Sequence, residues 1–299
     1  MNLPSQNNLS EAAVDVDDEL LRKWPLPELT GNGTKDARGN VLVVGGCSEM
    51  PGAVILAGLG ALRAGAGRLA IATAASVAPL VAAAIPEARV IALPEKSGCI
   101  RASAASLLAQ PLARADAVLV GPGMQHPPRI LSFLRRLELP ECSLVIDAEA
   151  IAALGLDSTL LTRLKGAALL TPHAGEMAQL TGRARDEIEA RQQASAVEAA
   201  RALGVTIALK GKETIIASPD GKTWISCSGN LGLGTSGSGD VLAGLVTGLI
   251  ARRASVTQAA VWGSHVHGRA GEELARTVGP LGYLARELLP LLPRLVCER

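Results

Sequence analysis

The chain has 299 residues, a net charge of +1 and 48% hydrophobic residues, which is typical of a globular protein of one large or two ordinary domains. The near-neutral charge gives no support to binding of nucleic acid or membrane surfaces, and an aromatic content of 2% argues against base-stacking platforms. The five cysteines are scattered without a Cys-x-x-Cys pair and predict reduced thiols. No signal peptide is visible and no apolar stretch reaches the ~20 residues of a membrane span, so we expect a cytoplasmic protein.

The order of elements predicts an N-terminal arm over residues 1–35 and one α/β domain over residues 36–299. Short apolar runs predict strands at 40–44, 68–73, 90–93, 117–120, 143–146, 168–170, 206–209, 214–217 and 222–226. Helices are predicted between them at 53–64, 76–84, 102–112, 129–137, 148–154, 174–180 and 185–203, and the chain reads as helical from Gly239 onward. This alternation predicts a mostly parallel central sheet flanked by helices on both faces.

Small and chemically reactive residues follow the predicted strands. They are Gly45-Gly46, Gly121-Pro122-Gly123, Asp147, His173 and Lys210-Gly211. Ligands of parallel α/β sheets bind outside the carboxyl ends of the strands. We therefore expect these residues to share one edge of the sheet.

A glycine-rich loop leads into an apolar helix between Gly229 and Gly248. A helix that begins near Ser238 directs its unpaired N–H groups and the positive end of its dipole at the loop, which favours an anion. Asp240 would repel that anion unless it had a chemical task or a metal beside it, and phosphoryl transfer with Asp240 as the base is our hypothesis. The spacing of Gly232, Gly234 and Gly237 also matches a dinucleotide fingerprint, but no strand follows it.

Each candidate outside this loop also has a structural interpretation. The segment 210–214 could be a plain hairpin, His173 could be a structural histidine, and Asp147 could cap the helix predicted at 148–154. The pair His265 and His267 lies in a helical pattern without acidic or cysteine neighbours. We interpret that pair as structural.

Taken together, several motifs resemble the ADP/ATP-dependent NAD(P)H-hydrate dehydratases. They are Val43-Val44-Gly45-Gly46, Met50-Pro51-Gly52-Ala53, Gly121-Pro122-Gly123, Thr171-Pro172-His173-Ala174-Gly175-Glu176, Lys210-Gly211 and the run from Gly234 to Gly244, within about residues 20–296. The resemblance implies a ribokinase-like three-layer sandwich. It also implies a metabolite-repair reaction, in which the S epimer of hydrated NADH or NADPH is phosphorylated on its hydroxyl by ADP or ATP and then expels phosphate, with ADP the expected donor giving AMP.

The same resemblance implies the site residues. The hydrate would be contacted by Ala53, Gly123, His173 and Asp240, with Asp240 as the catalytic base. The adenine nucleotide would be held by Lys210, Gly211, Lys212, Glu213, Thr214 and Gly239. Supporting residues would be Asp147, Glu176, Asn230 and Gly237. Mg²⁺ is implied as a cofactor, with Glu176 organising it through water. An epimerase domain, common in this family, is not visible, so the resemblance implies functional pairing with a separate epimerase.

Alternatives remain at the level of sequence. A ribokinase-like kinase for a vitamin-type alcohol such as hydroxyethylthiazole would share the Asp240 chemistry and release a stable phosphorylated product. A catalytically idle nucleotide-binding module is a second alternative, which the intact Asp240 disfavours. The apolar helices after Leu249 and the N-terminal arm predict a homo-oligomer.

Overall fold

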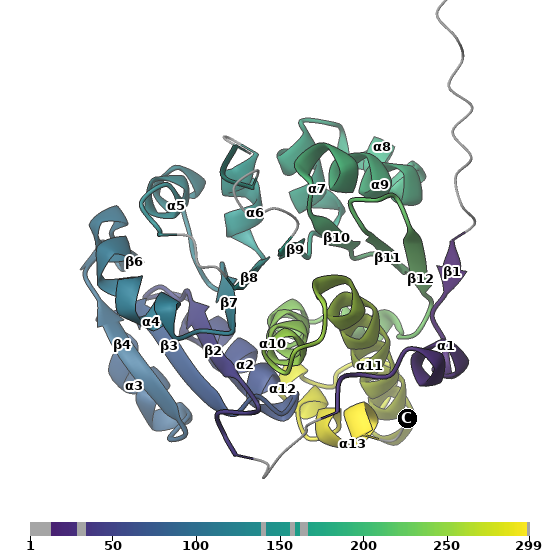
Figure 1. Cartoon of the computed structure of the whole chain (residues 1–299), viewed down its shortest axis with the longest axis horizontal. Coiled ribbons are helices and arrows are strands. Elements are labelled where there is room, and N and C mark those ends of the chain that lie inside the picture. The colour runs from purple at the N-terminus through teal and green to yellow at the C-terminus, as the bar shows by residue number, and fades with distance from the viewer. Residues whose placement is uncertain (1–12, 29–33, 139–141, 156–158, 162–166, 298–299) are drawn as a thin grey trace, which may run out of the picture.

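The structure is a computed structural model that describes residues 13–28, 34–138, 142–155, 159–161 and 167–297. A ten-stranded sheet is the central feature of these residues (Figure 1). From edge to edge its strands are β1 (Val14–Asp15), β12 (Thr223–Ser226), β11 (Thr214–Ala217), β10 (Thr206–Leu209), β9 (Ala168–Leu170), β8 (Ser143–Ile146), β7 (Ala117–Val120), β2 (Asn40–Val44), β3 (Arg68–Ala74) and β4 (Ala88–Leu93). Strands from β10 to β4 in this order are parallel, and β11 is antiparallel to both its neighbours. The predicted mostly parallel sheet is confirmed.

Helices cover both faces of the sheet (Figure 1). One face carries η1 (Ala102–Leu108), α4 (Ala109–Ala113), α5 (Pro127–Leu134), α6 (Glu149–Leu154), α7 (Ala174–Thr181), α8 (Arg185–Ala190) and α9 (Gln192–Leu203). The other carries α2 (Pro51–Arg63), α3 (Ala78–Ala84), α10 (Ser238–Ala251), α11 (Val256–Thr277), α12 (Ala285–Leu288) and α13 (Leu292–Cys297). Along β2, Val41 and Val43 face the second group and Leu42 and Val44 the first, because successive side chains of a strand alternate between faces. The described residues thus form three layers.

Small residues let α2 and α10 pack backbone to backbone. A Cβ added at Gly60 would lie 2.7 Å from the carbonyl oxygen of Val241, and one added at Gly244 would collide with the carbonyl oxygen of Ala57. Larger side chains would force the two helices apart, because packed interiors leave no spare volume. The tight contact fixes α10, which carries Asp240, against the helix that follows β2.

Part of the predicted N-terminal arm joins the domain. Strand β1 pairs with β12, and α1 (Asp18–Lys23) buries Leu21 completely. Trp262 Nε1 of α11 donates to the carbonyl oxygen of Trp24 at 2.9 Å, and His265 Nε2 lies 3.0 Å from Asp18 Oδ1. These contacts hold the segment on α11. Residues 1–12 and 29–33 of the predicted arm lie outside the described residues.

The continuous helix predicted at 185–203 is wrong. It is divided into α8 and α9 at Arg191, whose backbone angles of φ −134° and ψ 44° are not helical. The break places Gln192 at the start of α9, where its Nε2 would lie 2.7 Å from a Cβ at Gly211. Among the described residues, no helix is long and apolar enough to cross a membrane.

A short antiparallel hairpin follows β4. It consists of β5 (Glu95–Lys96) and β6 (Cys99–Ile100), and Ser97 and Gly98 form its turn with positive φ angles of 52° and 71°. The backbone N–H of Ser48, in the loop after β2, donates to the carbonyl oxygen of Gly98 at 3.0 Å. The hairpin is therefore anchored to the loop that links β2 to α2.

Candidate active site

The chemically reactive strand ends meet at one edge of the sheet, as predicted. Strands β2, β7, β8, β9 and β10 are consecutive and parallel, so the residues that follow them face the same side. His173 and Lys210, which follow β9 and β10, are bridge partners, and the Lys210 N–H donates to the carbonyl oxygen of Pro172 at 2.7 Å. The glycine-rich loop leads into α10, whose first turn lies against Lys210.

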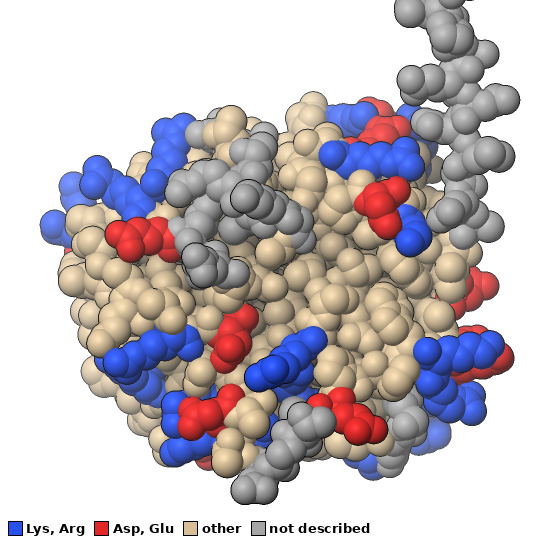
Figure 2. Space-filling model, viewed as in Figure 1, with Lys and Arg blue, Asp and Glu red and all other residues tan. Residues whose placement is uncertain are grey.

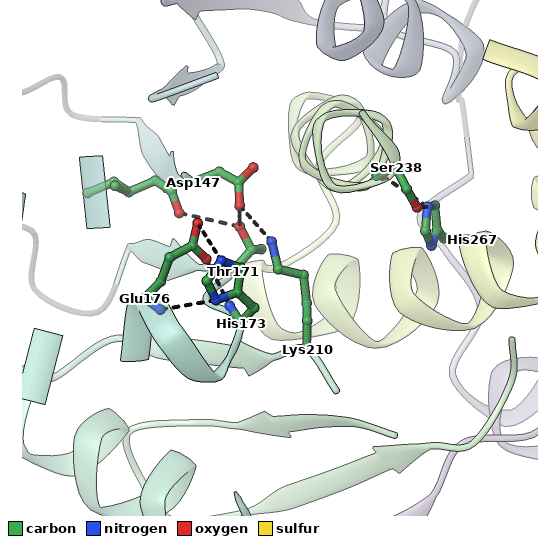
Figure 3. A network of polar contacts seen from close by, with 8 residues as sticks. Asp147, Thr171, His173, Glu176, Lys210, Ser238 and His267 are labelled. Atoms are coloured by element: carbon green, nitrogen blue, oxygen red, sulfur yellow. Dashed lines mark hydrogen bonds and ion pairs between the residues drawn. The ribbon is translucent and has the colours of Figure 1, made fainter. Parts of the chain in front are cut away.

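A buried carboxylate forms the floor of the site. Asp147 is 3% exposed, and its Oδ1 accepts a hydrogen bond from Thr171 Oγ1 at 2.6 Å and lies 3.0 Å from Lys210 Nζ (Figure 3). A buried charge requires such partners. The capping role considered for Asp147 is wrong: α6 begins after Ala148, whose positive φ of 56° turns the chain, and no side-chain oxygen caps the helix. Asp147 thus faces the strand ends.

His173 and Glu176 hold each other at the start of α7. The His173 N–H donates to Glu176 Oε2 at 2.8 Å, and the Glu176 N–H donates to His173 Nδ1 at 3.1 Å (Figure 3). In this reciprocal capping arrangement His173 Nε2 also lies 3.6 Å from Glu176 Oε1, and 60% of the His173 side chain is exposed. Burial raises the pKa of Glu176, an effect that Asp147 reinforces and Lys210 opposes.

Asp240 lies in the first turn of α10. Gly237 caps this helix with a φ of +88°, a conformation that favours glycine, and no described group accepts a hydrogen bond from the N–H groups of Gly239 and Asp240. Burial, reinforced by the charges of Asp147 and Glu176, raises the Asp240 pKa to about 7, although Lys210 opposes the shift. A carboxyl group with a pKa near 7 can act as a general base at neutral pH.

Lys210 connects the strand ends to the glycine-rich loop. A Cβ at Gly239 would lie 3.4 Å from Lys210 Nζ, so the ammonium group touches the first turn of α10. Burial lowers the pKa of Lys210, but the carboxylates of Asp147, Glu176 and Asp240 outweigh this effect and raise it. Lys210 therefore stays protonated and places a positive charge beside the unpaired N–H groups, which together form an anion-binding surface.

Ala53 of α2 and Gly123, which follows β7, lie side by side. Gly123 has a φ of +66°, and a Cβ added there would lie 3.0 Å from Ala53 Cβ, 2.6 Å from the Met50 carbonyl oxygen and 3.3 Å from Gly46 Cα. The close approach requires glycine at position 123 and brings the loops after β2 and β7 into contact.

A cavity of about 470 Å³ opens beside Lys210. It is lined by His173, Ala174, Arg185, Glu189, Gln192, Lys210, Gly211 and Lys212. Three of the six predicted nucleotide-binding residues therefore share a cavity, whereas Glu213, Thr214 and Gly239 lie outside its lining. Sequence reasoning missed the residues from α8 and α9; a signal existed only in the Arg185–Glu189 spacing, which also fits an ordinary surface ion pair.

Two further residues near the loop have defined positions. Asn230 Oδ1 accepts hydrogen bonds from the Gly232 N–H at 2.8 Å and from Tyr283 Oη at 2.9 Å, while its buried Nδ2 has no hydrogen-bond partner among the described residues. It caps η3 (Leu231–Leu233). His267 of α11, which sequence reasoning placed outside the site, contacts Ser238 through Nε2 (Figure 3).

The carboxylates of the site do not form a complete metal-binding site with other described side chains. Within the described ranges no group of three or more His, Cys, Asp or Glu side chains is arranged to hold a metal ion. The negative charges of Asp147, Glu176 and Asp240 nevertheless act on one another, and Asp147 Oδ2 accepts no hydrogen bond from the described residues. This set fits Mg²⁺ held mainly by nucleotide phosphates and water, the usual manner in phosphoryl transfer.

Solved structures share this architecture. The ADP/ATP-dependent NAD(P)H-hydrate dehydratase of Bacillus subtilis, co-crystallised with ATP and Mg²⁺, superposes with a TM-score of 0.79 at 29% identity and covers 95% of this chain and 98% of that chain. Ribokinase from Thermotoga maritima matches with a TM-score of 0.53 at 14% identity, over 85% of this chain and 99% of that chain, which shows the fold alone. The predicted ribokinase-like fold is confirmed.

Sequence comparison gives the family. A family model described as NAD(P)H-hydrate dehydratase matches residues 41–294. The ADP-dependent (S)-NAD(P)H-hydrate dehydratase of Xanthomonas campestris pv. campestris is 43% identical over 274 residues, which cover 91% of this chain and 92% of the relative. These matches span the sheet, the loop before α10 and the residues gathered at the strand ends. The chain belongs to the NAD(P)H-hydrate dehydratase family.

Proposed function

We propose that this protein dehydrates the S epimers of hydrated NADH and NADPH in a nucleotide-dependent reaction that repairs damaged cofactor. One observation carries the proposal: Asp240, with a pKa raised to about 7, stands in the first turn of α10 beside unpaired backbone N–H groups and the ammonium group of Lys210. A base and an anion-binding surface at one place suit transfer of a phosphoryl group to a hydroxyl.

The chemistry runs in two steps. The Asp240 carboxylate takes the proton of the hydrate hydroxyl, and the hydroxyl oxygen attacks the terminal phosphoryl group, whose bond to the rest of the nucleotide breaks. Phosphate then leaves the ring carbon with the electrons of the C–O bond, and loss of a ring proton restores the double bond of the dihydronicotinamide. The N–H groups of Gly239 and Asp240 and the charge of Lys210 stabilise the transferred group.

The two ligands occupy different sides of Asp240. The adenine nucleotide lies in the cavity lined by Lys210, Gly211 and Lys212, which we assign to the phosphoryl donor, with ADP expected to give AMP and phosphate. The hydrated ring lies between His173 and the contact of Ala53 with Gly123.

Mg²⁺ would join the phosphates of the donor, with Asp147 and Glu176 holding it through water. When bound, the ion neutralises charge on the phosphoryl group. Supply of the S epimer from the R epimer belongs to a separate epimerase, and assembly into a homo-oligomer remains a prediction.

The test is a direct assay. The protein is incubated with S-hydrated NADH, Mg²⁺ and either ADP or ATP, and recovery of NADH is followed by its near-ultraviolet absorbance. Recovery with release of phosphate is the expected result. No recovery with either nucleotide would refute the proposal, and accumulation of a stable phosphorylated product would indicate the kinase alternative instead.

A further inference from the structure

A second cavity lies toward the opposite end of the sheet from α8 and α9, which border the nucleotide cavity (Figure 1). It measures about 430 Å³ and lies between the β5–β6 hairpin and α5. It is lined by Lys96, Cys99, Ile100, Arg101, Ala102, Ser103, Pro128, Arg129 and Ser132. Figure 2 shows basic side chains near α5 and β6 at the left edge of the molecule, with acidic side chains below them. The floor is apolar and the rim is cationic.

Backbone contacts hold the two guanidinium groups at this rim. Arg101 Nε donates to the carbonyl oxygen of Glu95 at 2.9 Å, and Arg129 Nη1 donates to that of Lys96 at 3.4 Å. No carboxylate of the described residues forms an ion pair with Lys96, Arg101 or Arg129, and the Glu95 carboxylate is instead bonded to Ser76. Three positive charges without a protein counter-ion form a ready site for phosphate groups, which arginine binds through paired N–H donors.

Shared lining residues link this cavity to the neighbourhood of the proposed hydrate site. A narrow cleft lined by Gly46, Cys47, Gln125 and other residues shares Cys99, Ile100 and Arg129 with it. Gly46, which lines this cleft, is a neighbour of Gly123 in the proposed hydrate site: its Cα would lie 3.3 Å from a Cβ added at Gly123. The hydrogen bond from the Ser48 N–H to the Gly98 carbonyl oxygen ties the β5–β6 hairpin, which borders the cavity, to the loop after β2.

We propose that this cavity binds the phosphate groups of the adenosine half of the hydrated dinucleotide. The inference rests on the proposed function, which requires two phosphorylated ligands at once: a phosphoryl donor and a dinucleotide. The cavity at Lys210 accounts for the donor, and the cavity at Arg101 and Arg129 accounts for the non-reacting half of the substrate. Binding energy from that half then orients the reacting ring beside Asp240.

The test compares a double variant with a matched control. Arg101→Ala/Arg129→Ala removes two charges from the cavity, and Arg114→Ala/Arg136→Ala removes two exposed charges outside its lining. Each protein is assayed with S-hydrated NADH and with the hydrated dihydronicotinamide riboside, which carries no phosphate. We expect the cavity variant to raise KM for the dinucleotide about tenfold or more with unchanged kcat, and to leave kcat/KM for the riboside unchanged.

Two results would overturn the inference while the proposed function stands. One is an unchanged KM for the dinucleotide in the cavity variant, and the other is an equal loss with the riboside, which would indicate a damaged loop. If the unaltered protein converts neither substrate, the proposed function fails, and the cavity is then judged by calorimetric titration with ADP-ribose in the presence of saturating AMP. Weaker binding by the cavity variant than by the control supports the site; equal binding refutes it.

Discussion

His267 Nε2 lies 3.1 Å from both Oγ and the carbonyl oxygen of Ser238, two residues before Asp240. Burial lowers the His267 pKa to about 4, so the imidazole is neutral at physiological pH and its N–H donates to the Ser238 carbonyl oxygen. The contact ties α11 to the first turn of α10. We infer that His267 is a positioning residue for the base.

Replacing His267 tests this positioning role. His267→Ala should lower kcat roughly tenfold to a hundredfold and raise the nucleotide KM by a smaller factor, because the freed first turn of α10 carries Asp240 and Gly239 while the donor cavity at Lys210 is intact. His267→Gln, whose side-chain amide can donate to Ser238, should recover part of kcat. The control is His265→Ala, which removes the contact with Asp18 and should leave kcat within about twofold. Equal losses of kcat in the two alanine variants would contradict the assignment.

The same histidine makes folding stability depend on pH. Its pKa is about 4 in the folded protein against a reference value of 6.5, so between these values the unfolded chain binds a proton that the folded protein does not. The contribution of the neutral, buried His267 to the free energy of unfolding is fully present above pH 6.5 and is lost as pH falls toward 4. At pH 5 the free energy of unfolding should be lower by about 2 kcal/mol. Urea unfolding at pH 7 and pH 5 should show this loss in the parent protein and a smaller one in His267→Gln. Equal pH dependence in both proteins would rule out His267 as the cause.

Asp240→Asn tests the base directly. The amide cannot accept the hydroxyl proton in the same way, so kcat should fall by about 10²- to 10⁴-fold. Nucleotide binding should persist, because the backbone N–H groups of residues 239 and 240 and the charge of Lys210 remain. Both quantities can be measured, kcat by the repair assay and the dissociation constant of ADP by calorimetry. A fully active variant would refute the assignment of Asp240 as base.

The pKa of Asp240 predicts the pH profile of the reaction. The carboxylate is the active form and predominates above a pKa of about 7, so kcat/KM should fall about tenfold per pH unit below this value and level off above it. A profile that is flat from pH 5 to 8 would contradict the shifted pKa.

Sequence reasoning predicted the residues at the strand ends better than those on helices. Asp147, His173 and Lys210 could be placed together because parallel strands bring their carboxyl ends to one edge whatever the helices do. The contact of His267 with Ser238 and the place of Gln192 in the donor cavity depend on how α11 rotates against α10 and where the helix breaks at Arg191. Those are results of tertiary packing, which local spacing does not determine. Arg101 and Arg129 were missed for the same reason, because the hairpin and α5 are brought together only in the folded chain.

The positive charge of Lys210 contributes to the pKa of Asp240. Its positive charge lowers that pKa against the effects of burial, Asp147 and Glu176, so Lys210→Met should raise the pKa of Asp240 and move the rise in kcat/KM to higher pH. The variant should also weaken nucleotide binding, since the ammonium group lines the donor cavity. Lys212→Met is the matched control: it lines the same cavity but is not among the groups that shift the pKa of Asp240, so it should change the nucleotide KM and leave the midpoint of the profile in place. Midpoints that coincide in the two variants would show that Lys210 does not tune the base, and that its contact with Asp147 serves only to bind the nucleotide and hold the strand ends together.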